Sequence, residues 1–389
     1  MTQELTIKQK ISGLILATFF LAVSMAQFAY IQSTYLNQFF TIEFLGLVFF
    51  LAYLLTFIST NFYTNFIVRF GNLKTVVFAT IIDVLSFVIF IYCTNHYLVV
   101  IAFILYVIST NLIAVNFDIF LEAYTENFKT GKIRGIYYTI YNLGWLFSPL
   151  LAGEILSNFG YNSLFCLAIA LTLIFLLIII YSFRHFQIKT KVQHFYFRKT
   201  YAAIKADRNI RKIFFIAFLL QIFYAVMVLY TPLYLNQYIG LTWPQIGLVF
   251  TIMLLPFVLL QYPAGYIADK YIGEKEMLTA GLIIMAITSI TMFFIDTPSL
   301  ILWAIILFLS RVGASLAEIM RDTYFFKKVD VENVDLINAF RSTTPIEHIL
   351  VPIGVSLLLF YLPFNYIFLI LGLFLTSGLT FVLTIKDTK

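Results

Sequence analysis

The sequence predicts an all-α integral membrane protein in which twelve transmembrane helices form two pseudo-symmetric six-helix bundles. The first observation is composition: 61% of the 389 residues are hydrophobic and 11% are charged, against about 25% charged residues in soluble domains. The second is that apolar residues gather in twelve stretches of 20 residues or more, each able to cross a hydrocarbon core of about 30 Å. In chain order these stretches lie at about residues 10–36, 43–68, 73–94, 97–121, 133–156, 161–184, 212–236, 245–268, 275–295, 299–321, 336–361 and 364–385.

The placement of the 25 Lys and Arg residues predicts the orientation of these spans. The turns after odd-numbered stretches, such as Asn95-His96 and Asp296-Thr297-Pro298, carry none. The turns after even-numbered stretches carry Arg69, Lys74, Lys129, Lys132, Arg134, Lys270, Lys275, Lys327 and Lys328. Positive residues near span ends stay in the cytoplasm, so we expect a multi-pass protein of the cell membrane with both termini cytoplasmic. The net charge of +6 is then a topology signal and does not indicate nucleic-acid binding.

The two halves of the chain resemble each other. Tyr35-Leu36-Asn37-Gln38 closes the first span, and Tyr234-Leu235-Asn236-Gln237 closes the seventh. Matching residues along the two halves are offset by 199 to 203 positions. An offset of six spans predicts parallel repeats related by an axis along the membrane normal.

One long connection separates the repeats. From Arg184 to Lys212 the chain holds nine Lys or Arg and a single acid, Asp207, and its second half could form an amphipathic helix on the anionic inner leaflet. The predicted organisation is therefore an N-terminal six-helix bundle at 1–184, a basic cytoplasmic linker at 185–211 and a C-terminal six-helix bundle at 212–389.

Two motifs resemble those of the major facilitator superfamily. Between the eighth and ninth spans the chain reads GYIADKYIGEKE, which resembles the family signature Gly-x-x-Ala-Asp-Arg/Lys-x-Gly at Gly265, Ala268, Asp269, Lys270 and Gly273, with one extra residue before the last glycine. The first copy keeps Arg69 and Gly71 but has Thr64 and Val68 at the Gly and Asp positions. The fifth span is similar to the antiporter signature Gly-x-x-x-Gly-Pro-x-x-Gly-Gly at Gly144, Ser148, Pro149, Ala152 and Gly153. This resemblance implies a relation to proton-coupled drug and metabolite antiporters.

Four charged or titratable residues are expected near the membrane midplane, where such groups are costly and commonly functional. Asp83 is either a site for a proton or a cationic substrate, or a structural partner of Arg311 or of a polar residue. Glu347 is the candidate for the cavity, and the adjacent His348 either packs against a neighbour or tunes that carboxylate. Arg311 needs an anion: Glu347, Asp83 and an anionic substrate are the alternatives, because Glu318 lies about 10 Å along the same helix face.

Charged residues closer to the cytoplasm, together with the glycines of the signature, are predicted to form the inward gate, and the family resemblance implies that the charged ones latch it. In the first half this set comprises Arg69, Gly71, Asp118, Glu122 and Arg134. In the second half it comprises Gly265, Asp269, Lys270, Gly273, Glu318, Arg321 and Arg341. The absence of an acid at Val68 makes the first copy incomplete.

The cavity wall requires polar groups that can be buried at little cost. Residues of this kind near the predicted midplane are Gln27, Asn111, Tyr141, Asn142, Gln221, Tyr224 and Thr344. The sequence does not reveal whether they suit a sugar, a peptide, a drug or an organic anion.

These observations predict a secondary active transporter that moves a small molecule by alternating access, with proton-coupled efflux as the leading hypothesis. The alternative is an uptake carrier or uniporter for a small polar metabolite, in which the buried charges serve structure. The chain has neither a Walker Gly-x-x-x-x-Gly-Lys sequence nor a His-x-x-x-x-Asp acyltransferase motif, so we expect no enzymatic activity. We expect no cofactor, no metal and no nucleic-acid partner; the expected partners are a small-molecule substrate, protons and membrane lipids, and the protein is expected to be a monomer.

Overall fold

The structure is a computed structural model, and it describes residues 7–125, 130–184, 204–205, 207–329, 336, 340 and 343–386. Throughout these residues the secondary structure is helical, without strands. The chain divides into two compact units, one of Met1–Thr41 with Val48–Gln193 and the other of Ile42–Leu47 with His194–Lys389. The predicted domain boundaries stay a prediction, since residues 185–203 of the linker lie outside the described residues.

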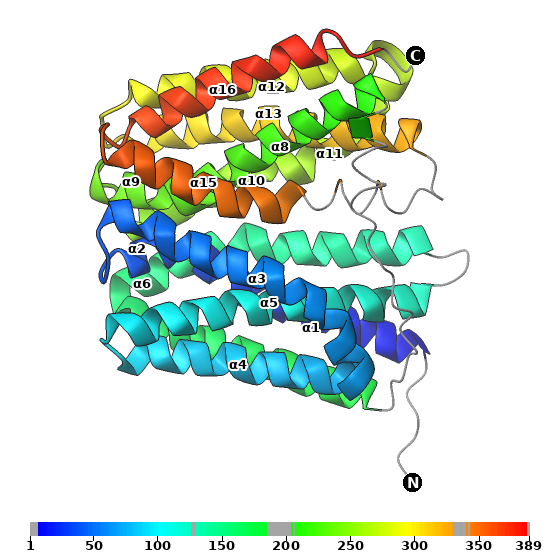
Figure 1. Ribbon diagram of the computed structural model, residues 1–389, viewed down its shortest axis with the longest axis vertical. Helices are drawn as coiled ribbons and strands as arrows, with labels where there is room; N and C mark the ends of the chain where they lie inside the picture. The colour runs from blue at the N-terminus through cyan, green and yellow to red at the C-terminus, as the bar shows by residue number, and fades with distance from the viewer. Residues whose placement is uncertain are drawn as a thin grey trace. The chain divides into compact units, whose positions relative to one another are not determined.

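The first unit is built from long helices that run side by side (Figure 1). In chain order they are α1 (Ile7–Ala29), α2 (Gln32–Leu36), α3 (Ile42–Phe70, whose first six residues belong to the second unit), α4 (Asn72–Tyr92), α5 (His96–Thr125) and α6 (Thr130–Phe183). Gly160, with φ 76° and ψ −177°, interrupts α6. A positive φ of this size favours glycine, so the predicted fifth and sixth spans are joined by a one-residue turn.

The second unit repeats this arrangement with more interruptions. Its elements are α8 (Arg208–Leu229), α9 (Thr231–Gln237), α10 (Trp243–Leu259), α11 (Gln261–Ile267), a π-helix (Ala268–Ile272), α12 (Glu274–Phe293), α13 (Leu300–Lys328), α15 (Thr343–Leu359) and α16 (Tyr366–Val382). The π-helix occupies the place where the signature has its extra residue, and a π-helix accommodates one additional residue in a helical run. The insertion seen in the sequence is therefore absorbed without a loop.

The seventh span begins earlier than predicted. The side chain of Asp207 accepts hydrogen bonds from the backbone N–H groups of Asn209 and Ile210, at 2.6 and 3.1 Å, and so caps α8. Residues 208–212, expected in a surface helix on the inner leaflet, form the first turn of α8 instead. The expectation was wrong because the cap extends the span helix into the basic segment.

The fold class is confirmed. Among the described residues, nine helical segments are long and apolar enough to cross a membrane. One of them, Thr139–Phe183, holds two spans joined at Gly160, and the 17-residue helices α15 and α16 supply two shorter ones. Together they make the twelve predicted spans.

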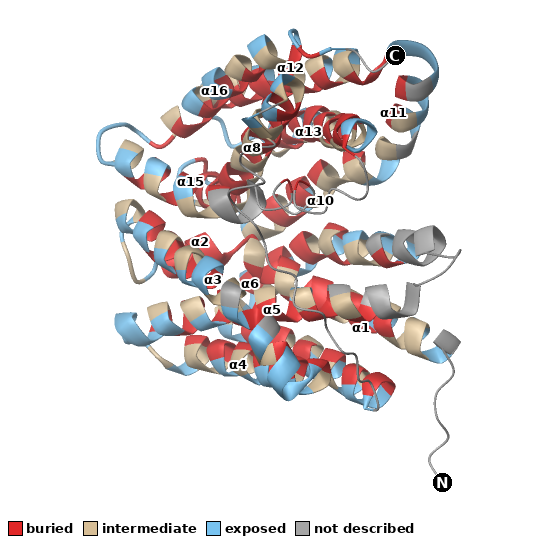
Figure 2. Cartoon of the chain, turned by 45° about the vertical axis from the view of Figure 1, so that its right-hand side comes forward, coloured by how far each residue is buried: buried red, intermediate tan, exposed pale blue. Residues whose placement is uncertain are grey.

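Burial follows the pattern of a membrane protein. Within the first unit, a core of aromatic and aliphatic side chains, including Phe117, Phe175 and Phe183, is fully buried. Figure 2 shows that exposed positions alternate with buried ones along the helices. Large apolar side chains point outward, for example Leu177, which is 68% exposed. Such a surface would be unstable in water but matches a hydrocarbon environment.

Close helix contacts depend on small residues at two crossings. A Cβ added at Gly144 of α6 would lie 2.6 Å from the Cβ of Ala22 in α1. In the second unit, Gly281 of α12 and Gly313 of α13 face each other, and a Cβ on either would lie 2.7 Å from the carbonyl oxygen of the other. The antiporter-like glycine at 144 therefore serves the packing of α1 on α6.

Candidate functional site: buried polar clusters in each unit

Asp83 lies inside the first unit, among α1, α4 and α6. Its side chain is buried, with the residue 2% exposed. The hydroxyl of Thr172 lies 3.5 Å from Asp83 Oδ2, and the hydroxyl of Ser24 lies 2.9 Å from that of Thr172. The other carboxyl oxygen, Oδ1, has no hydrogen-bond partner. Three helices thus contribute to a short chain of polar groups that ends on a carboxyl oxygen with unused capacity.

Aromatic residues surround this chain and connect it with predicted cavity residues. Tyr106 of α5 interacts electrostatically with Asp83, Tyr53 and Tyr141. Its ring packs edge-on against Phe28, with centroids 4.9 Å apart. Tyr106 therefore interacts both with the buried carboxyl group and with Tyr141, one of the predicted cavity residues.

Several predicted cavity residues of the first unit carry buried polar atoms without partners. Gln27 of α1 is fully buried, and neither its Oε1 nor its Nε2 has a hydrogen-bond partner. Asn111 Oδ1 also lacks a hydrogen-bond partner, and so does Nε1 of Trp145, a residue of α6 that was not among the predicted cavity residues. Tyr141 is half-buried and Asn142 is exposed. Buried polar groups are normally satisfied, so such atoms indicate a place where water or a ligand completes the hydrogen bonding.

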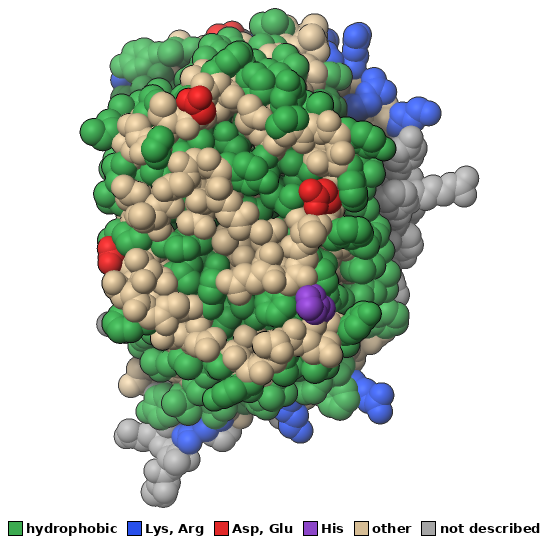
Figure 3. Space-filling view, turned by 90° about the vertical axis from the view of Figure 1, so that its left-hand side faces the viewer, with side chains coloured by type: hydrophobic (Ala, Val, Ile, Leu, Met, Phe, Trp, Pro, Cys, Tyr) green, Lys and Arg blue, Asp and Glu red, His purple; other side chains and the backbone are tan. Residues whose placement is uncertain are grey.

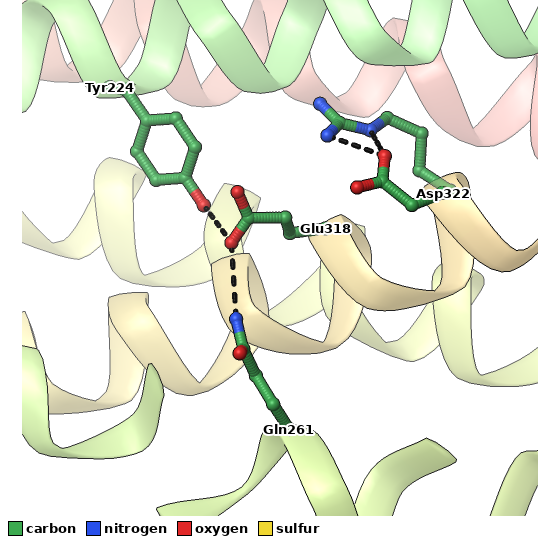
Figure 4. Close-up of polar contacts among 5 residues, drawn as sticks. Tyr224, Gln261, Glu318 and Asp322 are labelled. Atoms are coloured by element: carbon green, nitrogen blue, oxygen red, sulfur yellow. Dashed lines mark hydrogen bonds and ion pairs between the residues drawn. The ribbon is translucent and has the colours of Figure 1, made fainter. Parts of the chain in front are cut away.

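A polar cluster around Glu318 forms the corresponding feature of the second unit (Figure 4). Glu318 of α13 accepts hydrogen bonds from the hydroxyl of Tyr224 in α8 and from Nε2 of Gln261 in α11, each at 3.4 Å. The guanidinium carbon of Arg311, a residue only 2% exposed, lies 5.1 Å from the ring centroid of Phe223 and 5.5 Å from that of Tyr224. The rings stabilise the cation, and Glu318 interacts with it electrostatically across Tyr224.

This cluster joins residues that the sequence placed in different groups. Tyr224 was expected to line the cavity and Glu318 to latch the gate, yet the two are hydrogen-bonded. Gln261 was not predicted, although it is a polar residue that directly precedes the Tyr-Pro-Ala-Gly run of the signature. Gln221, another predicted cavity residue, is half-buried in α8.

Glu347 and His348 of α15 contact each other. His348 Nδ1 forms an ion-pair contact with Glu347 Oε1. Glu347 is fully buried, and its Oε2 has no hydrogen-bond partner. Neighbouring side chains on a helix diverge by about 100°, so this contact requires the imidazole to turn back toward the carboxylate. The geometry suits the hypothesis that His348 tunes Glu347.

Glu318 and Arg321 of the predicted gate set interact electrostatically with each other, whereas the other charged gate side chains that the structure describes contact residues outside the set. Lys270 donates to the hydroxyl of Tyr266 at 3.0 Å. Arg321 pairs with Asp322 at 2.7 Å, and Arg69 lies over the ring of Phe70 at 5.4 Å.

Two of the three glycines of the gate set have positive φ angles that favour glycine, and the third does not require it. Gly71 ends α3 with φ 86°, and Gly273 precedes α12 with φ 107°. Gly265 has room for a Cβ, whose nearest neighbour would be Ile319 at 3.6 Å.

For the remaining predicted site residues the structure gives no side-chain positions. The side chains of Asp118, Glu122, Arg134, Asp269 and Thr344, and the whole of Arg341, lie outside the described part of the structure. The latch therefore stays a prediction.

An ion pair that the sequence did not suggest joins Lys327 of α13 to the buried Glu274 at the start of α12.

Comparison with known proteins decides the family. The sequence model of the Major Facilitator Superfamily matches residues 13–244 and 213–389. The chain belongs to the major facilitator superfamily. It is accordingly a membrane transporter and not an enzyme.

A solved structure supports the same fold. The chain is similar to a bacterial homologue of the iron transporter ferroportin in an inward-facing state, with a TM-score of 0.79 and 15% identity, over 97% of this chain and 99% of that chain. At 15% identity this likeness shows the fold of the chain and does not indicate the substrate of the chain. No curated protein matches the sequence significantly.

Proposed function

We propose that this transporter is a secondary active carrier that couples movement of a small molecule to protons, in the direction of efflux. The observation that carries the proposal is Asp83, a buried carboxyl group whose only hydrogen-bond partner among the described residues is the hydroxyl of Thr172. Among the described residues no Lys or Arg forms an ion pair with it. A carboxyl group in such surroundings can exchange its proton only when a conformational change admits water, which is what a proton-coupled carrier requires.

Glu347 supports the proposal from the second unit. It is fully buried and has one oxygen, Oε2, without a hydrogen-bond partner. His348 contacts its other oxygen and is the residue type that titrates nearest to neutral pH. One candidate proton site in each repeat would let both units respond to the same gradient.

Efflux rests on the antiporter-like segment in α6. Ser148 donates to the carbonyl oxygen of Gly144 at 2.6 Å and lies 3.3 Å from that of Val23 in α1, so the substituted signature keeps a close contact between α1 and α6. The structural relative is described as a homologue of an iron transporter. Among the described residues no group of three or more His, Cys, Asp or Glu could hold a metal ion, so we do not extend that cargo to this chain.

The experiment is a flux screen in proteoliposomes. Purified protein is reconstituted, a pH gradient is imposed, and radiolabelled sugars, peptides, organic anions and cationic drugs are tested one by one. The proposal expects at least one compound to accumulate against its gradient and to lose that accumulation when an uncoupler collapses the pH difference. Movement that runs only down the compound's own gradient and ignores the uncoupler would instead establish the alternative, a uniporter with structural carboxylates.

A further inference from the structure

A basic pocket opens at the N-terminal end of α8, where that helix meets the C-terminal end of α16. The cavity has a volume of about 490 Å³ and is lined by Arg208, Arg211, Lys212, Phe215, Thr380, Phe381 and Thr384. Lys212, 8% exposed, donates to the backbone oxygen of Thr384 at 2.5 Å. Arg208 and Arg211 are exposed. The pocket is therefore lined by one lysine that is mostly buried and by two exposed arginines.

The cations of this pocket lack a matching anion among the described residues. Lys212 interacts electrostatically with Arg208, Arg211 and Lys275, all of the same sign. The nearby acid, Asp207, is engaged in capping α8. The linker does not supply a carboxylate, since residues 185–206 contain five Lys or Arg and no Asp or Glu. A pocket of this composition attracts an anion from outside the chain.

An apolar groove continues from the pocket along the same helix. Its cavity of about 380 Å³ is lined only by aliphatic, aromatic and glycine residues of α8, α15 and α16: Phe218, Ile222, Val226, Leu350, Val351, Gly354, Val355, Leu358, Ile367, Ile370, Leu371 and Phe374. Phe215 of the basic pocket contacts residues that line each of the two cavities. Its ring lies 4.4 Å from that of Phe381 and 6.3 Å from that of Phe374, which lines the groove. Figure 1 shows α8 between α15 and α16.

The dimensions of this composite site match one leaflet of a bilayer. At 1.5 Å per residue, the rise along α8 from Phe215 to Val226 is about 16 Å. One leaflet of a hydrocarbon core is about 15 Å thick. The predicted orientation places the N-terminal end of α8 at the inner leaflet, whose acidic lipids attract basic residues near the membrane surface.

We propose that this composite site binds one acidic phospholipid, with its phosphate at Arg208, Arg211 and Lys212 and an acyl chain in the groove between α8, α15 and α16. The charge of the pocket selects an anion, and the groove selects a ligand with a long apolar tail. A soluble phosphate could satisfy the first part and would leave the second empty. The lining of the two cavities includes neither Asp83 nor Glu347, the buried carboxyl groups to which the coupling proposal refers.

The first test measures headgroup preference. The full-length protein, delipidated in detergent, is titrated with phosphatidylglycerol or phosphatidylcholine, and bound lipid is counted by native mass spectrometry. The wild type is expected to prefer phosphatidylglycerol. Arg208→Gln/Arg211→Gln should reduce that preference by roughly 25-fold, because each cation near the surface contributes about a factor of five. Arg208→Lys/Arg211→Lys should keep most of it, and Lys74→Gln/Lys328→Gln, which removes as much charge elsewhere, should not change it.

The second test addresses the tail. A Cβ added at Gly354 meets no atom within 4 Å, so a large side chain can enter the groove without a clash at its base. Gly354→Trp should weaken binding of both lipids by a similar factor, whereas Gly354→Ala should bind as the wild type. Each variant must elute as a single species at the wild-type volume before it is compared.

Three outcomes would overturn the proposal. The first is an unchanged preference for phosphatidylglycerol in Arg208→Gln/Arg211→Gln, and the second is unchanged lipid binding in Gly354→Trp. The third is displacement of phosphatidylglycerol by inorganic phosphate at millimolar concentration, which would make the pocket a site for soluble anions.

Discussion

Alanine at Gly313 should push α12 and α13 apart, because the two helices touch through their backbones there. The added Cβ would lie 2.7 Å from the carbonyl oxygen of Gly281, whereas ordinary contacts are 3.4–4 Å, so the helices must separate by about 1 Å. Overpacking of this kind costs about 1–3 kcal/mol. Alanine also favours a helix over glycine by about 1 kcal/mol, which partly masks the cost.

Gly354→Ala removes that ambiguity because it carries the same helix gain without a contact within 4 Å. The difference in unfolding free energy between Gly313→Ala and Gly354→Ala should therefore equal the overpacking cost, about 1–3 kcal/mol. Gly281→Ala/Gly313→Ala should cost less than the two single variants together, because one separation of the helices relieves both clashes.

The assay is thermal unfolding of the purified variants in one detergent, followed by size-exclusion chromatography of the protein that remains folded. Gly313→Ala should melt below the wild type or near it, and always below Gly354→Ala. Equal melting of Gly313→Ala and Gly354→Ala, or full additivity of the double variant, would refute the close contact between α12 and α13.

The other predictions concern the ion pair, the gate and the topology. Lys327→Gln removes the ion pair with Glu274 and should lower the unfolding free energy by about 1–3 kcal/mol. This range is below that of a fully buried pair because the side chain of Lys327 is 43% exposed, and a melting temperature equal to that of the wild type would contradict it. Asp269→Asn should reduce turnover more than substrate affinity in proteoliposomes if it biases a conformational equilibrium, and turnover within about twofold of the wild type would leave the latch without support. A cysteine placed at Gln193 should resist a membrane-impermeant thiol reagent added to sealed cells, and rapid labelling there would reverse the predicted orientation.

The fold followed from the sequence because hydrophobic length and the positions of Lys and Arg are direct consequences of the bilayer. The exact ends of the helices depended on local hydrogen bonds, which the hydrophobic periodicity of the sequence does not reveal. In the sequence Asp207 was noted only as the single acid of the linker, whose charge favoured a surface helix, but its side chain caps α8 and determined where that helix begins. The extra residue in the signature was visible as well, whereas its accommodation in the π-helix at Ala268–Ile272 depends on hydrogen bonding.

The polar residues of the spans were predictable, and their partners were not. The sequence identifies Tyr224 and Glu318 as polar residues within spans, yet their hydrogen bond joins positions 94 residues apart. Thr172 gave almost no signal, being one hydroxyl within the apolar run Leu-Thr-Leu-Ile-Phe of the sixth span. Its place beside Asp83 follows from the packing of α4 on α6, which the sequence does not encode in a local pattern.

The distribution of charged residues can be followed both on one face of the structure and in the predicted outward turns. Figure 3 shows a face on which carboxylate groups and a histidine are visible within the surface and Lys and Arg project only at its margins. The absence of Lys and Arg from the predicted outward turns is a feature of the sequence alone. Labelling of a cysteine at position 193 would measure the orientation that the placement of Lys and Arg predicts.

The central claim is that buried carboxyl groups couple transport to protons, and one comparison in proteoliposomes tests it directly. For the compound identified by the flux screen, accumulation driven by a pH gradient is measured beside exchange between equal internal and external pools, in the wild type, Asp83→Asn and Glu347→Gln. The account predicts that at least one neutral variant loses accumulation and retains exchange, because exchange needs only the loaded carrier to move whereas accumulation needs the proton. If both variants still concentrate the compound as the wild type does, Asp83 and Glu347 are structural and the coupling account is wrong.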